Sequence, residues 1–302
     1  MSITNHIDNR SMFLKEVLID QRIYGAECHC TSSDVGTGFF KIYHDGAFSY
    51  IEDVYESIGK FDKRMQQFTY NAKESHSILL YKAYEQLARE MLSGETVTFQ
   101  PGTIIFISNI DKQNLASYDQ TIRRITQLLN EACSLPVQLL TEIFREELCR
   151  AAAANSLELG FLLIGHTEQE TYPEFTLVLD SVMDSVEVGR IRVNQFLEQY
   201  TENLCLNLWC FQEMLVNAIE HGNQFAIEKK VTVHVQVRKE FVIFVITDEG
   251  NGFDWRKKIR EESCLLSSSE RGRGIVMSNM LCTFMVYNDS GNQVTLVFTL
   301  EK

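Results

Sequence analysis

Residues 213–223 read Glu213-Met214-Leu215-Val216-Asn217-Ala218-Ile219-Glu220-His221-Gly222-Asn223. Glu213, Asn217 and His221 recur at every fourth position, which places them on one face of a helix predicted over about 204–221. Leu215 and Ile219 can point to a core from the same helix. Because a polar helix face is often merely solvated, the segments that follow it must decide between a solvated surface and a site.

A glycine-rich loop comes after two β-branched strands that we predict over 231–237 and 241–247. The loop reads Asp248-Glu249-Gly250-Asn251-Gly252-Phe253. A carboxylate at the end of a buried strand can accept a hydrogen bond from an exocyclic amine, and glycines let the backbone pass close to a flat base. In isolation, the same loop is equally compatible with an ordinary turn.

The third segment is also rich in glycine. It reads Arg271-Gly272-Arg273-Gly274-Ile275 and opens a short helix predicted over about 275–281. Backbone N–H groups at a helix start can hold phosphate oxygens, and the helix dipole favours negative charge there. Strands are predicted on either side, with 175–179 before the first helices and 283–288 and 293–300 after this one. The order of all three segments along one such unit indicates a nucleotide site.

These three segments resemble the N-box, G1 box and G2 box of GHKL ATPases, most closely the serine kinases that act on anti-sigma-factor antagonists. The resemblance covers about 175–302 and implies an α/β sandwich of the GHKL, histidine-kinase-like type that binds ATP and Mg²⁺. By this resemblance Glu213 is the catalytic base that activates a serine hydroxyl. Asn217 is the Mg²⁺ ligand through its side-chain oxygen, and His221 belongs to the nucleotide site.

The resemblance also assigns the glycine-rich loops. Asp248 is expected to bind the adenine amine, with Gly250 and Gly252 shaping the base pocket. The phosphates would lie against Gly272 and Gly274. Either Arg271 or Arg273 would neutralise charge on the γ-phosphate, although the short segment differs from kinases that place an arginine earlier.

The implied activity is that of a protein-serine kinase, an anti-sigma-factor-like regulator that phosphorylates a small STAS-type antagonist and has a sigma factor as a further partner. A non-catalytic, nucleotide-gated binding switch on a pseudophosphatase scaffold is the alternative. Histidine kinases use related boxes, but none of the seven histidines has the context of a phospho-accepting dimerisation helix. We therefore rank a serine kinase above a histidine kinase.

The chain is expected to divide into a domain over residues 1–168 and the ATP-binding domain over 169–302. The first should be an α+β domain in which His44-Asp45-Gly46 is a hairpin turn. Its other predicted elements are a helix over 75–93, a strand over 96–108 that crosses a turn at 100–102, helices over 119–133 and 136–154, and a strand over 159–164.

Residues 25–165 faintly resemble bacterial metal-dependent PPM-type phosphatases of the sporulation stage II type, which would give this domain a β-sandwich. Asp53 stands where that family has a metal-binding aspartate. A two-metal centre needs several such aspartates, but Gly38, Ser108-Asn109-Ile110 and Leu157-Glu158 replace the others. We expect a degenerate, inactive phosphatase-like domain for sensing, docking or homodimerisation. An unrelated α+β domain is the alternative.

Composition limits the classes of partner. The 302 residues carry a formal net charge of -13, which disfavours nucleic acid and anionic membranes because an acidic surface repels phosphate. The eight cysteines show no zinc or disulfide pattern, and Cys28-His29-Cys30 has no second ligand pair. The N-terminus lacks a signal-peptide pattern, and no apolar run reaches roughly 18 residues. We expect reduced thiols and a cytoplasmic protein.

Overall fold

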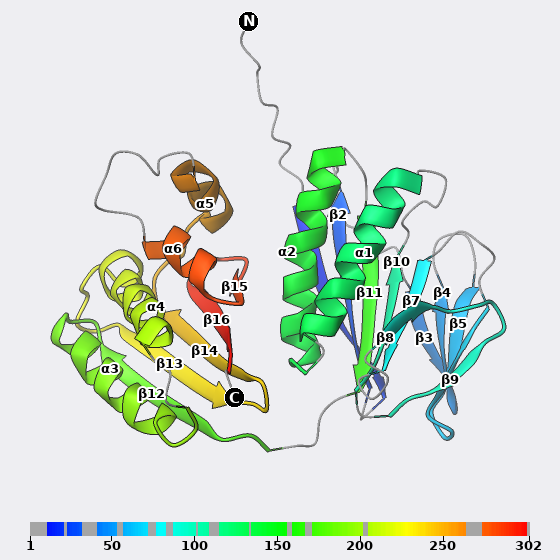
Figure 1. Cartoon of the computed structure of the whole chain (residues 1–302), viewed down its shortest axis with the longest axis horizontal. Coiled ribbons are helices and arrows are strands. Elements are labelled where there is room, and N and C mark those ends of the chain that lie inside the picture. Colours follow the sequence, from blue (N-terminus) through cyan, green and yellow to red (C-terminus); the bar gives the residue numbers. More distant parts are fainter. Residues whose placement is uncertain are drawn as a thin grey trace, which may run out of the picture. The chain divides into compact units, whose positions relative to one another are not determined.

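The computed structural model describes residues 11–20, 23–31, 41–52, 57–71, 77–82, 87–100, 102–108, 115–132, 134–155, 159–166, 171–201, 205–263 and 274–300. Contacts divide the chain into two compact units, Met1–Gln169 and Glu170–Lys302 (Figure 1). The boundary expected from the sequence, between residues 168 and 169, lies one residue before this division.

The N-terminal unit contains two antiparallel sheets and two helices. A six-stranded sheet has the order β1-β2-β11-β10-β7-β8, and a five-stranded sheet has the order β3-β4-β5-β6-β9. The elements of the six-stranded sheet are β1 (Ser11–Asp20), β2 (Ile23–Thr31), β7 (Ser77–Lys82), β8 (Leu87–Glu90), β10 (Thr103–Ser108) and β11 (Leu159–His166). Those of the second sheet are β3 (Lys41–Asp45), β4 (Phe48–Glu52), β5 (Ser57–Asp62), β6 (Gln67–Tyr70) and β9 (Thr96–Thr98). The helices are α1 (Leu115–Ala132) and α2 (Val137–Asn155).

The central strands β10 and β11 of the six-stranded sheet are buried on both faces. On one face, Ile105 packs into a core shared with Phe61 of the five-stranded sheet. On the other, Phe106 and Phe161 pack against Phe144 of α2, and the Phe106 centroid lies 5.3 Å from the centroids of both other rings. Figure 1 shows the helices on one side of this sheet and the five-stranded sheet on the other. These layers confirm the predicted α+β class and the stacked sheets.

The helix predicted over 75–93 is wrong, because this segment forms the antiparallel strands β7 and β8. Leu80 faces the core between the two sheets, and its neighbours Leu79 and Tyr81 are also buried. A strand buried on both faces carries a continuous apolar run, which periodicity cannot distinguish from a buried helix. The strand predicted over 96–108 is likewise two strands, β9 and β10, which belong to different sheets.

The residues at the positions compared with a phosphatase metal centre fall largely outside the part of the chain that the structure describes. Gly38, Asp53, Asn109, Ile110, Leu157 and Glu158 all lie there. Ser108 ends β10 and is fully buried. Within the described ranges, no group of three or more His, Cys, Asp or Glu side chains is placed to hold a metal ion.

The C-terminal unit is a five-stranded antiparallel sheet in the order β12-β13-β14-β16-β15, with helices on one face (Figure 1). The strands are β12 (Glu174–Asp180), β13 (Lys230–Val237), β14 (Phe241–Asp248), β15 (Phe284–Tyr287) and β16 (Gln293–Thr299). The helices are α3 (Asp184–Leu197), α4 (Cys205–Asn217), α5 (Trp255–Ser263) and α6 (Gly274–Leu281). This arrangement confirms the predicted α/β sandwich, whereas α5 was not predicted.

Side chains on one face of this sheet form the core under the helices. Val233, Phe244 and Leu296 point into the core from successive strands, where they meet Phe211 and Leu215 of α4. The Phe211 and Phe244 rings stack with centroids 5.7 Å apart. No helix within the described ranges has the length and apolar character needed to cross a membrane.

We expect Phe106→Ala to lower the free energy of unfolding of the N-terminal unit by about 3–5 kcal/mol, because it removes a fully buried ring between β10 and α2. Chemical unfolding followed by circular dichroism measures the change. Leu92→Ala is the control, since that side chain is 75% exposed and its loss should matter by less than about 0.5 kcal/mol. Equal effects of the two substitutions would contradict the described core.

Candidate functional site

Helix α4 ends in an unusually wide turn beside the glycine-rich loop. The helix continues beyond Asn217 as a π-helical turn over Ala218–Gly222, which Asn223 closes by donating its N–H to the Ala218 carbonyl at 2.8 Å. Such turns occur frequently at functional sites. Here the turn carries His221 to the rim of a cavity and Gly222 against the end of β14.

A cavity of about 290 Å³ lies where these elements meet. It brings together Asn217 and His221 from the end of α4 and the π-turn, Asp248 from the end of β14, Gly252 from the loop after β14, and Ile275 from the start of α6. The remaining lining residues are Met214, Ala218, Gly222, Ile246, Phe253, Lys258, Tyr287, Gly291, Asn292 and Val294. The site is therefore a mostly apolar pocket with a few polar groups, the usual composition of a small-molecule site.

The Asp248 carboxylate occupies space that two glycines leave open. It is 9% exposed, and its Oδ1 accepts a hydrogen bond from the Gly250 N–H at 2.8 Å. A side chain at Gly222 would overlap this carboxylate, and one at Gly250 would overlap the Gly222 carbonyl. Gly250 does not line the cavity itself but lets the loop fold back onto the π-turn.

The backbone of Asp248 is fixed by Asn292, which precedes β16. The Asp248 N–H donates to the Asn292 carbonyl at 2.9 Å, and the Asn292 side-chain amide donates to the Asp248 carbonyl at 3.1 Å. Asn288 in turn holds this turn, because its Oδ1 accepts the N–H groups of Gly291 and Asn292 at 2.8 and 3.1 Å. The sequence analysis missed both asparagines, although their spacing within Asn288-Asp-Ser-Gly-Asn292 is typical of a turn.

Two loops cross closely at the floor of the site. Gly252 has φ +70° and Gly291 φ +76°, a region that disfavours any side chain. A side chain at Gly252 would overlap the Ser290 carbonyl, and one at Gly291 would overlap the Phe253 carbonyl. The Phe253 N–H donates to the Ser290 carbonyl at 3.0 Å, so the crossing is held by a hydrogen bond that needs both glycines.

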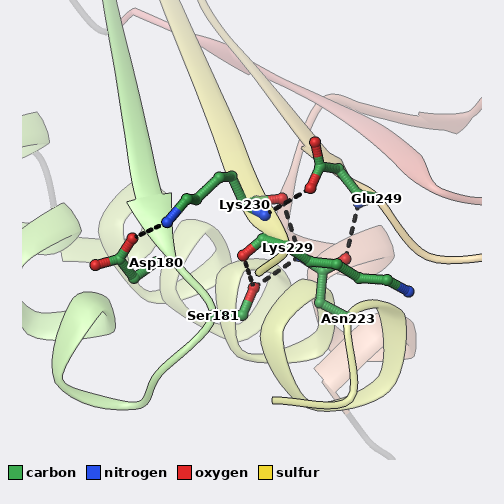
Figure 2. A network of polar contacts seen from close by, with 6 residues as sticks. All are labelled: Asp180, Ser181, Asn223, Lys229, Lys230 and Glu249. Carbon is green, nitrogen blue, oxygen red and sulfur yellow. Dashed lines mark hydrogen bonds and ion pairs between the residues drawn. The ribbon is translucent and has the colours of Figure 1, made fainter. Parts of the chain in front are cut away.

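Asn223 joins three chain segments just behind the site (Figure 2). It is fully buried, and its amide donates to Ser181 Oγ at 2.8 Å and to the Lys230 carbonyl at 2.9 Å. Its Oδ1 accepts the Glu249 N–H at 2.8 Å. The end of β12, the start of β13 and the end of β14 are thereby held together. The sequence analysis included Asn223 only as the end of its first segment.

Further polar contacts surround the side-chain amide of Asn223. Ser181 Oγ donates to the Lys229 carbonyl at 2.8 Å, and the Lys230 N–H donates to Glu249 Oε2 at 2.8 Å. Lys230 Nζ also lies 2.5 Å from Asp180 Oδ1. Figure 2 shows the six residues as one connected network, so Glu249, which follows Asp248, is bonded to the start of β13 and, through Asn223 and Ser181, to the segment after β12.

Three aromatic rings pack α5 against one wall of the cavity. The Tyr287 ring, which lines the cavity, stacks on Trp255 with centroids 5.5 Å apart and meets Phe253 edge-on at 5.4 Å. The Tyr287 hydroxyl donates to Met214 Sδ at 3.4 Å. The cluster thus connects β15, α4 and the first turn of α5 at one wall of the cavity.

Glu213 lies one helical turn before Asn217 and is half-buried at the junction of α4 with α6. It does not line the cavity, but a side chain at Gly274, the first residue of α6, would come within 2.5 Å of its Oε2. Burial raises the pKa of Glu213. Burial also raises the pKa of Asp248, against a smaller opposing effect of its hydrogen bond with Gly250.

Three other expected site residues, Arg271, Gly272 and Arg273, lie outside the described part of the chain. The amide of Asn217 donates from its nitrogen to Met214 Sδ at a long 3.9 Å, a contact that leaves its oxygen unused. Amide oxygen is a ligand that Mg²⁺ accepts. The described residues therefore place an amide oxygen that can bind a metal ion, a buried carboxylate and apolar side chains around one cavity.

Comparison with known families agrees with this geometry. Residues 204–298 match the model of the histidine kinase-like ATPase domain. The C-terminal unit contains a histidine kinase-like ATPase domain. All residues that line the cavity fall inside the matched range of this ATPase domain, whereas β12 and α3 precede it.

Two further comparisons were with curated proteins and with solved structures. No curated protein matches the chain. Among solved structures, the chain is similar to the RsbU and RsbW domains of Rv1364c from Mycobacterium tuberculosis, with 13% identity over 96% of this chain and 89% of that one and a TM-score of 0.31. A TM-score of that size does not establish a common fold.

We expect Gly252→Ala to destabilise the ATPase domain by more than about 3 kcal/mol, since it combines an unfavourable φ with overlap against the Ser290 carbonyl. Gly46→Ala is the control, because Gly46 also has a positive φ of 54° but nothing lies within 4 Å of an added Cβ. That substitution should cost only about 1–2 kcal/mol. Thermal unfolding of both variants measures the difference, and equal costs would show that the loops do not cross as described.

We expect Asp248→Asn to stabilise the protein without ligand at neutral pH. The raised pKa means that the folded state binds the Asp248 proton more tightly than the unfolded state. The favourable contribution of the protonated group is therefore present at low pH and is lost as the pH rises through the raised pKa. Melting temperatures across pH should show the variant above the wild type at neutral pH and a difference that shrinks toward about pH 4. A variant less stable by the same margin at every pH would contradict this.

Proposed function

We propose that this protein is an ATP- and Mg²⁺-dependent protein-serine kinase, an anti-sigma-factor-like regulator that phosphorylates a small STAS-type antagonist and so controls its exchange between partners. The observation that carries the proposal is the placement of Glu213. This carboxylate lies one turn before Asn217, faces the first residue of α6, and has its pKa raised by burial.

The residues around the cavity fit an adenine nucleotide. Asp248 offers a carboxylate acceptor for the exocyclic amine, and Met214, Ile246 and Val294 give apolar walls for the faces of the base. Gly222 and Gly252 line the cavity with backbone atoms alone. ATP supplies the phosphoryl group when it is bound, and the protein's task in such a transfer is mainly alignment and charge neutralisation.

The other roles that we propose fall to residues at or near the cavity and to the segment before α6, which lies outside the described part of the chain. Asn217 would hold Mg²⁺ through its amide oxygen, and His221 would contact the nucleotide at the rim. Glu213 would take the proton from the acceptor serine, a task for which a raised carboxyl pKa is suited because it lies closer to the working pH. Gly274 would hold phosphate at the start of α6, with Gly272 and either Arg271 or Arg273 before it.

For the N-terminal unit we propose a degenerate phosphatase-like domain that senses a signal, docks a partner or forms a homodimer. Its two stacked sheets and paired helices suit such a domain. The formal net charge of -13 favours protein partners over nucleic acid and anionic membrane, and a STAS-type antagonist and a sigma factor are the partners we propose, in the cytoplasm.

We expect Glu213→Gln to abolish transfer while nucleotide binding persists. Loss of a general base typically slows a reaction by about 10²–10⁴-fold. The assay incubates the full chain with radiolabelled Mg-ATP and a purified STAS-type protein from the same organism, and follows label that survives acid, as phosphoserine does and phosphohistidine does not. A thermal melt with Mg-ATP checks binding, because ligand at 100 times its Kd adds roughly 2.7 kcal/mol.

Glu220→Gln is the matched control, since Glu220 is exposed, follows Glu213 on the same chain segment and does not line the cavity. This variant should transfer phosphate at the wild-type rate. Wild-type transfer by Glu213→Gln would overturn the base assignment. An ATP-dependent thermal shift in a protein that transfers no phosphate to the antagonist would favour a nucleotide-gated binding switch instead.

A further inference from the structure

A lysine of α5 lines the same cavity as Asp248. Among the cavity-lining residues that the structure describes, Asp248 carries the carboxylate and Lys258 the ammonium group. Adenine nucleotides carry an amine at one end and negatively charged phosphates at the other. A pocket with one carboxylate and one ammonium group can recognise both ends.

The first turn of α5 is fixed at the wall of this cavity. Asp254 caps the helix, because its Oδ1 accepts the Lys257 N–H at 2.9 Å and its carbonyl accepts the Lys258 N–H at 3.1 Å. Trp255 is 3% exposed and stacks on Tyr287, which itself lines the cavity. Lys258 therefore extends from a backbone position that packing holds in place.

The neighbouring basic residues of α5 are directed differently. The Arg256 guanidinium lies 4.4 Å above the Trp255 ring and 3.6 Å from Asp289 Oδ1, so its charge is engaged with these two groups. Lys257 is exposed and does not line the cavity. Of these three successive basic side chains, Lys258 is the one at the site.

We propose that Lys258 binds a phosphate group of the nucleotide and so gives the site its preference for nucleotides over nucleosides. This inference rests on the proposed ATP site. An ammonium group on a flexible stem is a common phosphate ligand, and a local cation favours the entry of a highly charged anion into a chain with a net charge of -13. The phosphates then lie away from Asp248, whose charge would repel them.

Isothermal titration calorimetry of the full chain with ATP, ADP and adenosine tests the assignment. Lys258→Met removes the charge and keeps most of the stem. We expect it to weaken ATP and ADP binding about tenfold or more, the effect of losing one charge-assisted contact, and to leave adenosine binding unchanged. Lys258→Arg should remain close to the wild type, as should the matched control Lys257→Met.

The outcomes separate this inference from the proposed function. ATP binding by Lys258→Met as tight as that of the wild type would overturn the phosphate contact and leave the ATP site intact. An equal loss of ATP and adenosine binding would show that Lys258 serves packing only. If the wild-type chain binds none of the three compounds, the proposed function itself is wrong, and the role of Lys258 fails with it.

Discussion

The buried carboxylate of Asp248 sets the geometry of the whole site. It needs space against the π-turn at Gly222 and a backbone donor from Gly250, and neither position tolerates a side chain. Asn292 fixes its backbone from the turn before β16, and Asn223 fixes the next residue from its position just after the π-turn. An acceptor so firmly held loses little freedom when a ligand binds, which is how preorganised polar groups gain affinity and selectivity.

The site holds two carboxyl groups in positions where burial disfavours their ionised forms. Asp248 and Glu213 both lie in surroundings that disfavour their ionised forms, and the large apolar core under α3, α4 and α6 offsets that cost. Perturbed carboxyl groups beside a cavity are a common mark of functional sites. The two carboxylates differ in their positions, since one lines the cavity and the other faces the start of α6.

Local pattern was enough for the elements whose faces differ in polarity. The β-branched runs predicted β13 and β14, and the helical spacing around Glu213 predicted α4. Of the residues expected at the site, Asn217, His221, Asp248 and Gly252 line one cavity. Local pattern failed for β7, because a strand buried on both faces has no polar side to reveal its period. It also missed α5, whose very polar sequence is held by one cap and the stacking of Trp255 on Tyr287. The partners of Asn223 could not be foreseen, because they come from three segments that meet only in the folded chain.

The hydrogen-bond network around Asn223 extends beyond the residues that match the family model. The matched range begins at residue 204. Ser181, whose hydroxyl accepts a hydrogen bond from the buried Asn223 amide, lies before that range, directly after β12. A fragment starting at residue 204 would bare the long edge of β13 to other chains, a template for aggregation, and would leave a buried donor without its acceptor. The pocket and its supporting network lie together in the compact unit Glu170–Lys302, in which β12 covers the edge of β13 and the residue after β12 supports the loop after β14.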